Sequence, residues 1–303
     1  MTHMRRALTA ATLMTLIFQA APAAPCGQSA SRALVRFGIV TDVHFADIDA
    51  NGARTYRESD RKLAECVQVM NDQRADFLVE LGDFKDQDPT PQEARTLGFL
   101  RHIESVFSGF DGPRYHVLGN HDVDSLSKAQ FLSIAKNGAA GLTRPHYRFV
   151  RKGVQFVVLD ADHKRDQSDY DHGNFDWGDA NLDDVQLTWL EHTLAVSREP
   201  AVVFIHQQLD GEGAYYVRNA AAVRRLLEAA GNVLAVFQGH RHEGGFSVIN
   251  GVPYYTLKGT IEGSGPASNS YAIVEVRDDR SVWVTGYRHA ESRGFQAAPA
   301  AKR

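Results

Sequence analysis

Short apolar runs alternate with segments of helical periodicity through most of the chain. An unbroken apolar run is typical of a buried strand, whereas apolar residues spaced three or four apart indicate one face of a helix. Strands are predicted at residues 35–41, 77–81, 114–118, 201–205 and 233–237, and helices at residues 56–73, 92–107, 185–196 and 217–230. This alternation predicts an α/β fold in which helices cover parallel strands.

Other segments show the pattern of antiparallel strands. Residues 147–151 and 154–159 flank the turn Lys152-Gly153 and predict a hairpin that begins a second layer. Further short strands are predicted at residues 245–249, 253–257, 271–276 and 282–287. Helices around two sheets predict one four-layer domain at residues 34–288, because no linker rich in Pro, Gly or Ser divides the chain.

Both ends of the chain differ from this domain. A pair of arginines near the start, the apolar stretch after it and the small-x-small triplet at residues 21–23 predict a cleaved export signal at residues 1–23. The protein is therefore expected in the periplasm or the medium, with no membrane anchor after cleavage. Residues 24–33 are predicted to be a linker and residues 289–303 a flexible tail.

Composition narrows the class of partner. A chain of 303 residues, of which 43% are hydrophobic, can bury a large core. Its net charge of -4 offers no basic surface to polyanions, so we expect a small-molecule partner and no obligate nucleic acid. The two cysteines, Cys26 and Cys66, lie outside the polar segments described next, which excludes thiolate zinc chemistry. Whether they pair in an exported protein stays open.

Five short polar segments follow the apolar runs, where parallel strands bring side chains to one cleft. They are Asp42-Val43-His44, Gly82-Asp83-Phe84-Lys85-Asp86, Gly119-Asn120-His121-Asp122, the single His206, and Gly239-His240-Arg241-His242. All of them offer carboxylate, amide or imidazole groups, which are common ligands of divalent metals. Together they predict a binuclear metal site.

The ligand types indicate how two ions can be shared. Asp42 and His44 are two residues apart at a strand end, so both side chains can face one cation. Asp83 can bridge two ions because a carboxylate has two oxygens, and the glycine before it permits a tight turn. Each motif alone also occurs in ordinary turns, and a lone histidine such as His206 is often structural. The prediction therefore depends on the whole set.

The order and spacing of these segments resemble the calcineurin-like metallophosphoesterase family over residues 34–288. The resemblance implies an α/β/β/α sandwich with two mixed sheets. It implies that one ion is held by Asp42, His44, Asp83 and His242, and the other by Asp83, Asn120, His206 and His240. A hydroxide held between the ions would attack phosphorus in line, with His121 as general acid and Asp86 orienting it. Manganese is the favoured metal, with iron, zinc or cobalt as alternatives.

A narrower resemblance is to manganese-dependent ADP-ribose/CDP-alcohol diphosphatases. It is carried by residues 37–47, 54–59, 186–190 and 239–245, and by Gly259-Thr260-Ile261-Glu262. It implies hydrolysis of a phosphoanhydride in a small nucleotide. Phe45 and Tyr56 could then stack on a base, and Arg54 and Arg57 could bind phosphate. Core packing and surface ion pairs are the alternative explanations for these four residues.

Three functions stay open at the level of sequence. The first is hydrolysis of a phosphoanhydride or phosphodiester, and the second is an exported phosphomonoesterase. The third, a non-catalytic metal-binding protein, is disfavoured because every expected ligand and His121 are present. The polar stretch at residues 160–184 is too long for an ordinary connection and is a candidate active-site loop. In this stretch and in residues 211–216, Asn174, Trp177 and Tyr215 could bind a leaving group or only pack the loop.

Overall fold

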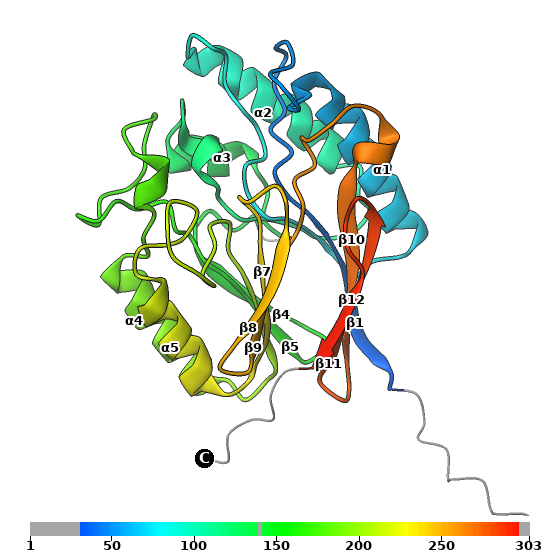
Figure 1. Ribbon diagram of the computed structural model, residues 1–303, viewed down its shortest axis with the longest axis vertical. Helices are drawn as coiled ribbons and strands as arrows, with labels where there is room; N and C mark the ends of the chain where they lie inside the picture. The colour runs from blue at the N-terminus through cyan, green and yellow to red at the C-terminus, as the bar shows by residue number, and fades with distance from the viewer. Residues whose placement is uncertain (1–30, 139–140, 297–303) are drawn as a thin grey trace, which may run out of the picture. The chain divides into compact units, whose positions relative to one another are not determined.

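Two mixed sheets of six strands each lie face to face in the computed structural model, which describes residues 31–138 and 141–296 (Figure 1). The first sheet contains β1 (Ala33–Val40), β2 (Leu78–Glu80), β3 (Arg114–His116), β10 (Ser270–Arg277), β11 (Ser281–Arg288) and β12 (Arg293–Gln296). The second contains β4 (Tyr147–Arg151), β5 (Val154–Val158), β6 (Ala201–Phe204), β7 (Val233–Gln238), β8 (Gly245–Ile249) and β9 (Val252–Thr256). Their strand orders are β12-β11-β10-β1-β2-β3 and β4-β5-β6-β7-β9-β8.

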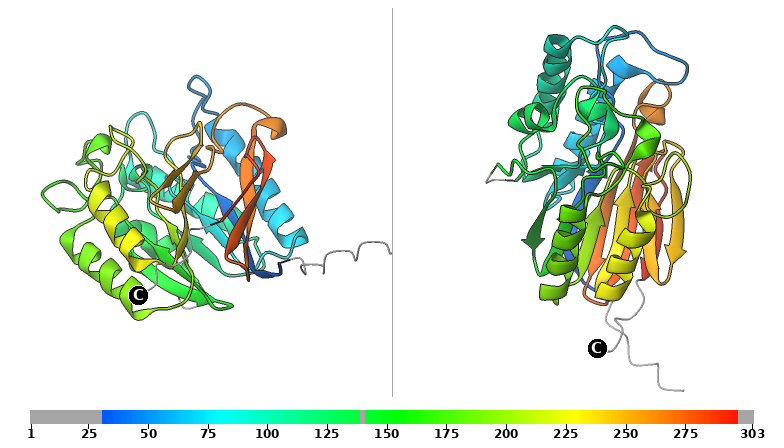
Figure 2. Two further views of the ribbon diagram at one scale, coloured as in Figure 1. Left: turned by 60° about the horizontal axis from the view of Figure 1, so that its bottom comes forward. Right: turned by 90° about the vertical axis from the view of Figure 1, so that its left-hand side faces the viewer.

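Helices cover the outer faces of both sheets, which gives the four layers seen in Figure 2. The helices are α1 (Ser59–Asp72), α2 (Glu93–Phe107), α3 (Lys128–Ile134), α4 (Asp184–Val196) and α5 (Ala220–Ala230), with the short 3-10 helices η1 (Tyr56–Glu58), η2 (Asn120–Val123), η3 (Trp177–Asp179) and η4 (Pro266–Ser268). The pair α1 and α2 packs on the first sheet, and the pair α4 and α5 on the second. The predicted α/β/β/α sandwich is confirmed.

Aromatic side chains fill the space between the sheets. Phe37 of β1 stacks on Phe77 with ring centroids 4.9 Å apart, and it meets the second sheet edge-on at Phe156 and Phe204. All four side chains are fully buried. Because burying one such ring contributes about 1.5–3 kcal/mol, this inter-sheet core fixes how the two sheets face each other. This packing also holds the five polar segments at the sheet edges in fixed positions relative to one another.

Parallel pairing explains why motifs distant in sequence meet. β1, β2 and β3 are neighbours and parallel in the first sheet, and β6 and β7 are parallel in the second. The carboxyl ends of parallel strands lie at one edge of a sheet. The five polar segments follow these five strands, so they all reach the same end of the sandwich.

One helix and one edge strand of the structure differ from the sequence-based prediction. Helix α3 was not predicted, because its seven residues are too few to show a periodic pattern. Residues after 288 were predicted to be a loose tail, but β12 pairs antiparallel with β11 as an edge strand. The predicted export signal and Cys26 lie outside the described residues, whereas Cys66 is buried in α1.

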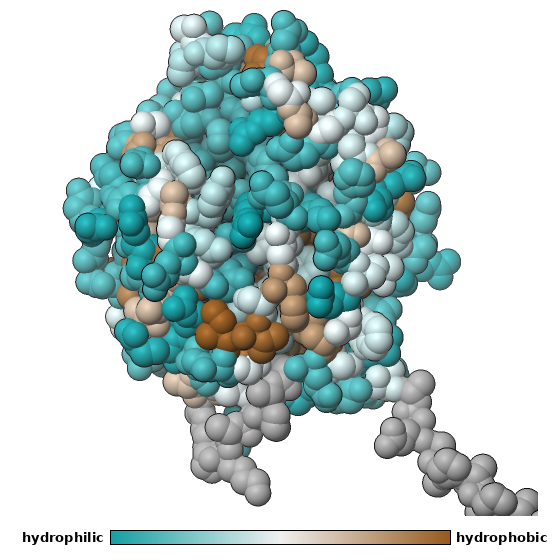
Figure 3. All heavy atoms as spheres, viewed as in Figure 1, coloured by the Kyte–Doolittle hydropathy of each residue, from teal (hydrophilic) through white to brown (hydrophobic). Residues whose placement is uncertain are grey.

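Polar residues cover most of the face shown in Figure 3. The face shown in Figure 3 has apolar residues gathered in one small area near its lower edge. Within the described ranges, no helix combines the length and the hydropathy needed to cross a membrane.

Candidate metal centre

All seven predicted metal ligands lie at the carboxyl ends of the central parallel strands. Asp42 and His44 follow β1, Asp83 follows β2, Asn120 follows β3 in η2, His206 follows β6, and His240 and His242 follow β7. Each of them is buried except His242, whose side chain is 12% exposed. Both sheets therefore contribute to one cluster, hereafter the ligand cluster.

Side chains of the ligand cluster approach one another closely. His242 Nε2 lies 3.2 Å from Asp42 Oδ1 and 3.3 Å from His44 Nε2. Asp83 lies between two groups of ligands, because its Oδ2 is 3.5 Å from His44 Nε2 and 3.1 Å from His206 Nε2. This central place is the one that a bridging carboxylate requires.

Some ligand atoms have no hydrogen-bond partner among the described residues. Asn120 Oδ1 and His240 Nε2 are buried without one. Such atoms are costly to bury unless an ion or another group satisfies them. Ligating atoms within 4.8 Å of one another belong to Asp42, His44 and His242 in one group and to Asp83, His206 and His240 in another. These residues fit two divalent ions with mixed oxygen and nitrogen ligands.

The backbone of the ligand cluster adopts unusual conformations. Asp42, His44, Asp83 and His240 have positive φ angles of 52°, 47°, 57° and 67°. Such a conformation costs about 1–3 kcal/mol per non-glycine residue and is concentrated at functional sites. The tight turn predicted before Asp83 depends on Gly82, because a Cβ there would lie 2.5 Å from the ring of His206.

Groups outside the cluster fix the orientation of its imidazoles. His206 Nδ1 lies 2.9 Å from a backbone carbonyl, and His242 Nδ1 lies 2.6 Å from Glu262 Oε1. His44 Nδ1 lies 3.2 Å from Asp86 Oδ2. All three rings therefore present Nε2 to the cluster, which is how such outer contacts prepare a metal ligand.

Electrostatic attraction outweighs the effect of burial on the pKa of His206 and of His242, but not on that of His240. Burial alone would lower the pKa of His206, but the charge of Asp83 outweighs it and raises this pKa to about 10. Asp42 acts in the same way on His242, whose pKa is raised to about 9. Burial and the neighbouring His206 instead lower the pKa of His240 to about 3. The carboxylates of the ligand cluster therefore stabilise positive charge on two of its imidazoles, while the imidazole of His240 stays neutral.

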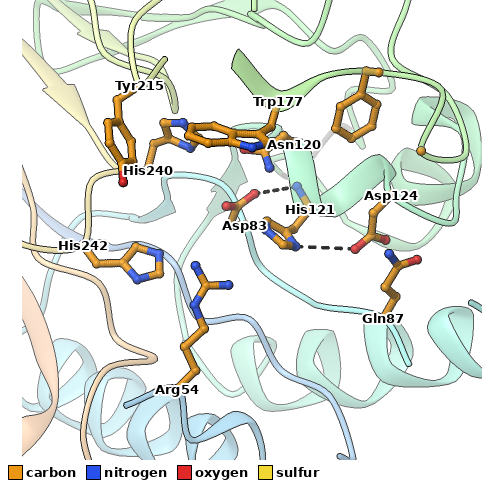
Figure 4. A pocket seen from close by; sticks show the side chains of 12 residues that line it. Arg54, Asp83, Gln87, Asn120, His121, Asp124, Trp177, Tyr215, His240 and His242 are labelled. Carbon is orange, nitrogen blue, oxygen red and sulfur yellow. Dashed lines mark hydrogen bonds and ion pairs between the residues drawn. The ribbon is translucent and has the colours of Figure 1, made fainter. Parts of the chain in front are cut away.

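The predicted acid, His121, lies beside two carboxylates. Its Nδ1 is 3.4 Å from Asp86 Oδ1 and 3.6 Å from Asp124 Oδ2. Figure 4 shows His121 beside Asp124. The buried Lys85 donates to Asp124 and to the backbone carbonyl of His121. Asp86 therefore contacts both His121 and His44. Sequence reasoning missed Lys85 and Asp124, although Lys85 lies inside one of the five segments.

A cavity of about 470 Å³ opens over the ligand cluster. Its lining residues are Arg54, Asp83, Gln87, Asn120, His121, Asp124, Gly173, Phe175, Trp177, Tyr215, His240 and His242. The rings of Trp177 and Tyr215 are 5.4 Å apart, and each lies within 6 Å of the His240 ring (Figure 4). Asn174 instead accepts the backbone N–H of Asp171 inside its own loop.

The four residues predicted to contact substrate lie in different parts of the structure. Arg54 lines the cavity, but the other three lie elsewhere. Phe45 stacks on His102, and Tyr56 is only 6% exposed in the core beneath the helices. Arg57 pairs with Asp47 on the surface. Phe45 and Tyr56 are therefore packed in the core and Arg57 forms a surface ion pair, in agreement with the alternative explanations.

Comparisons with known proteins agree with this geometry. The chain is 27% identical to a manganese-dependent ADP-ribose/CDP-alcohol diphosphatase of Oryza sativa subsp. japonica, over 87% of this chain and 95% of that protein. It is 25% identical to the human protein of the same name, over 83% of this chain and 90% of that protein. A dimetal phosphatase from Danio rerio shares the fold, with a TM-score of 0.77 at 23% identity over 88% of this chain and 100% of that chain.

A family model gives the most direct assignment. It is described as calcineurin-like phosphoesterase and matches residues 35–244, which include all five polar segments. The ligand types, their order along the chain and their meeting point between two sheets agree with this match. The chain therefore belongs to the calcineurin-like phosphoesterase family.

Proposed function

We propose that this protein hydrolyses a phosphoanhydride or phosphodiester bond in a small nucleotide-type substrate, such as ADP-ribose or a CDP-alcohol. Family membership makes the chain a metal-dependent hydrolase of phosphoric esters. The observation that carries the narrower proposal is a cavity lined both by the ligand cluster and by the half-exposed rings of Trp177 and Tyr215. These rings offer a stacking surface to an organic group that a simple phosphate lacks.

Two divalent cations fit the ligand cluster, and the names of the relatives favour manganese. Asp42, His44 and His242 would hold one ion, Asn120, His206 and His240 the other, with Asp83 shared between them. When bound, the ions would neutralise phosphate oxygens and lower the pKa of a water molecule that attacks phosphorus. Iron, zinc and cobalt suit the same ligand types.

In this proposal His121 donates a proton to the leaving group. Its Nδ1 faces Asp86 and Asp124, so Nε2 is the nitrogen left for the leaving oxygen. Transfer of the Nε2 proton as the P–O bond breaks lets that oxygen depart with less negative charge. Because Asp86 also contacts His44, it fixes the acid relative to the ligand cluster.

Arg54 extends into the cavity from the segment between β1 and α1 (Figure 4). A guanidinium binds two phosphate oxygens at once, which suits the second, unreacting phosphate of an anhydride. Trp177 and Tyr215 can then contact the base or sugar beyond it. The cavity thus separates a reacting phosphorus from a recognised organic group.

A product assay on the purified protein with manganese tests the proposal. ADP-ribose, CDP-choline, bis-p-nitrophenyl phosphate and p-nitrophenyl phosphate are offered in parallel. We expect nucleoside monophosphates from the first two at the highest kcat/KM. A preference for p-nitrophenyl phosphate would overturn the substrate class and identify a phosphomonoesterase instead.

Two variants test the assigned roles. Asp83→Ala should lose both ion binding and hydrolysis, and full turnover with two ions bound would refute the bridging role. His121→Ala should keep the ions, measured by calorimetry, but lose rate most on substrates with poor leaving groups. If the variant loses the same fraction of its rate on substrates with good and with poor leaving groups, the acid role is contradicted.

Export is a separate part of the proposal. The features of residues 1–23 support cleavage near the Ala21-Pro22-Ala23 triplet, which would place the enzyme among extracytoplasmic nucleotides. N-terminal sequencing of protein from the producing cells tests this. A cytosolic product that begins at Met1 would refute it.

A further inference from the structure

The segment of residues 160–184, hereafter the wall segment, forms one side of the cavity. It supplies Gly173, Phe175 and Trp177 to the lining. Apart from Asp184, which begins α4, its helical structure is limited to the single turn η3 (Trp177–Asp179). The backbone N–H groups of His172 and Gly173 donate to the carbonyls of Leu126 and Val123, and side-chain contacts near the start of the segment add to this attachment.

One buried lysine makes several of these contacts. Lys128 Nζ, at the start of α3, donates to Asp160 Oδ2 at 2.6 Å and to Asp169 Oδ1 at 2.7 Å, and it lies 3.3 Å from His163 Nε2. The side chain of Lys128 is 9% exposed and that of Asp160 is fully buried. We call these four residues the Lys128 cluster. A buried ammonium is stable only with such partners, so the cluster specifies one geometry.

The Lys128 cluster has the ligand types of a metal site, but a lysine supplies its positive charge. Ligating atoms of Asp160, His163 and Asp169 lie within 4.8 Å of one another, as they would around a cation. The ammonium of Lys128 already supplies that positive charge at hydrogen-bonding distance. The cluster is therefore an internal fastening for the wall segment and needs no added ion.

Contacts lead directly from this cluster to the aromatic lining. Tyr170, next to Asp169, is fully buried, and its ring stacks on Phe175 with centroids 4.0 Å apart. Its hydroxyl donates to the backbone carbonyl of Asp176 at 3.0 Å, immediately before Trp177. These contacts connect Asp169 to both lining rings, in addition to the backbone hydrogen bonds of His172 and Gly173 that hold the same stretch.

We infer that Lys128 is a positioning residue for substrate specificity: through Asp160 and Asp169 it fixes the wall segment, so that Phe175 and Trp177 are preformed to receive the organic part of a nucleotide-type substrate. The inference rests on the proposed function for the identity of that substrate. It predicts that a change which loosens the Lys128 cluster weakens binding of the organic group and leaves the chemistry at the ligand cluster unchanged. Preformed recognition of this kind lowers the entropic cost of binding.

The substitution Asp169→Asn tests this with little risk to folding, because that side chain is 60% exposed. Asp166→Asn is a matched control on the same segment, since Asp166 is exposed and, among the described residues, its side chain hydrogen-bonds only to Ser168. We expect D169N to lose about tenfold in kcat/KM for ADP-ribose, mainly through KM, while bis-p-nitrophenyl phosphate is hydrolysed as before. D166N should match the unaltered protein on both substrates.

Hydrogen–deuterium exchange of the protein without added metal gives a second readout. D169N should raise exchange in residues 170–179, and D166N should not. Equal exchange in the two variants would refute the fastening role whatever the activity. If exchange rises but both substrates lose rate equally, the specificity role is refuted. If the unaltered protein cleaves neither substrate, the proposed function fails, and the exchange result still decides the fastening.

Discussion

Asp122 connects the two turns that carry Asp83 and Asn120, and its replacement by asparagine should be severe. Its Oδ2 accepts the backbone N–H groups of Asp83 and Gly119 at 3.0 and 2.9 Å. Its Oδ1 accepts those of Phe84 and Lys85 at 2.9 and 3.4 Å. The side chain is fully buried. Both oxygens are therefore needed as acceptors, and no water can replace either.

The magnitude follows from counting the donors that would be left unpaired. An asparagine at this position has one acceptor oxygen, so its NH₂ group would face two backbone N–H groups. Each buried, unpaired N–H costs about 1–3 kcal/mol, which gives about 2–6 kcal/mol for the pair. For a domain of this size, each kcal/mol lowers the Tm by roughly 2–4 °C. We expect a fall in Tm of at least about 4 °C.

Urea unfolding followed by circular dichroism measures this loss. Asp183→Asn is the matched control, because Asp183 caps α4 by accepting the N–H of Gln186 at 2.8 Å and asparagine caps a helix equally well. The control should stay within about 0.5 kcal/mol of the unaltered protein. A free energy of unfolding for D122N within about 1 kcal/mol of the control would refute the account of these four hydrogen bonds.

Three further predictions follow from the site and the core. Glu262→Gln should weaken the binding of one ion by about 10–100-fold in calorimetry, because Glu262 orients His242; unchanged affinity would contradict this. Burial lowers the pKa of His116, but Glu104 and Glu80 outweigh burial and raise this pKa to about 9. The charged ring therefore contributes its full stability below about pH 6.5, and this stability is lost as the pH rises towards 9. His116→Phe should remove this alkaline fall in urea unfolding, and a persistent fall would point to other groups. A chelator should abolish hydrolysis and added manganese should restore it, whereas activity that survives complete removal of metal would refute the metal-dependent mechanism.

Local pattern in the sequence determined most of the architecture. Apolar runs and helical spacing predicted the strands that carry the five polar segments, because burial on both faces requires continuous apolar residues. The ligand types were equally plain, since carboxylate, amide and imidazole side chains at strand ends are chemically distinctive. The α/β class and the five polar segments could therefore be predicted from pattern, whereas the assignment of each ligand to an ion came from the resemblance to the calcineurin-like family. Short elements such as α3 and β12 were missed because few residues carry too little pattern.

Only the tertiary structure decided which residues share the cavity. Phe45 and Tyr56 follow the first motif in sequence, yet both pack into the core, whereas Arg54 reaches the cavity. Lys128 and Asp169 are far apart in the chain and meet because α3 packs beside the wall segment, at a distance of 2.7 Å between Nζ and Oδ1. Sequence periodicity reports which face of an element is buried, but the partner across that face is set by inter-sheet packing and by the compensation of buried charge.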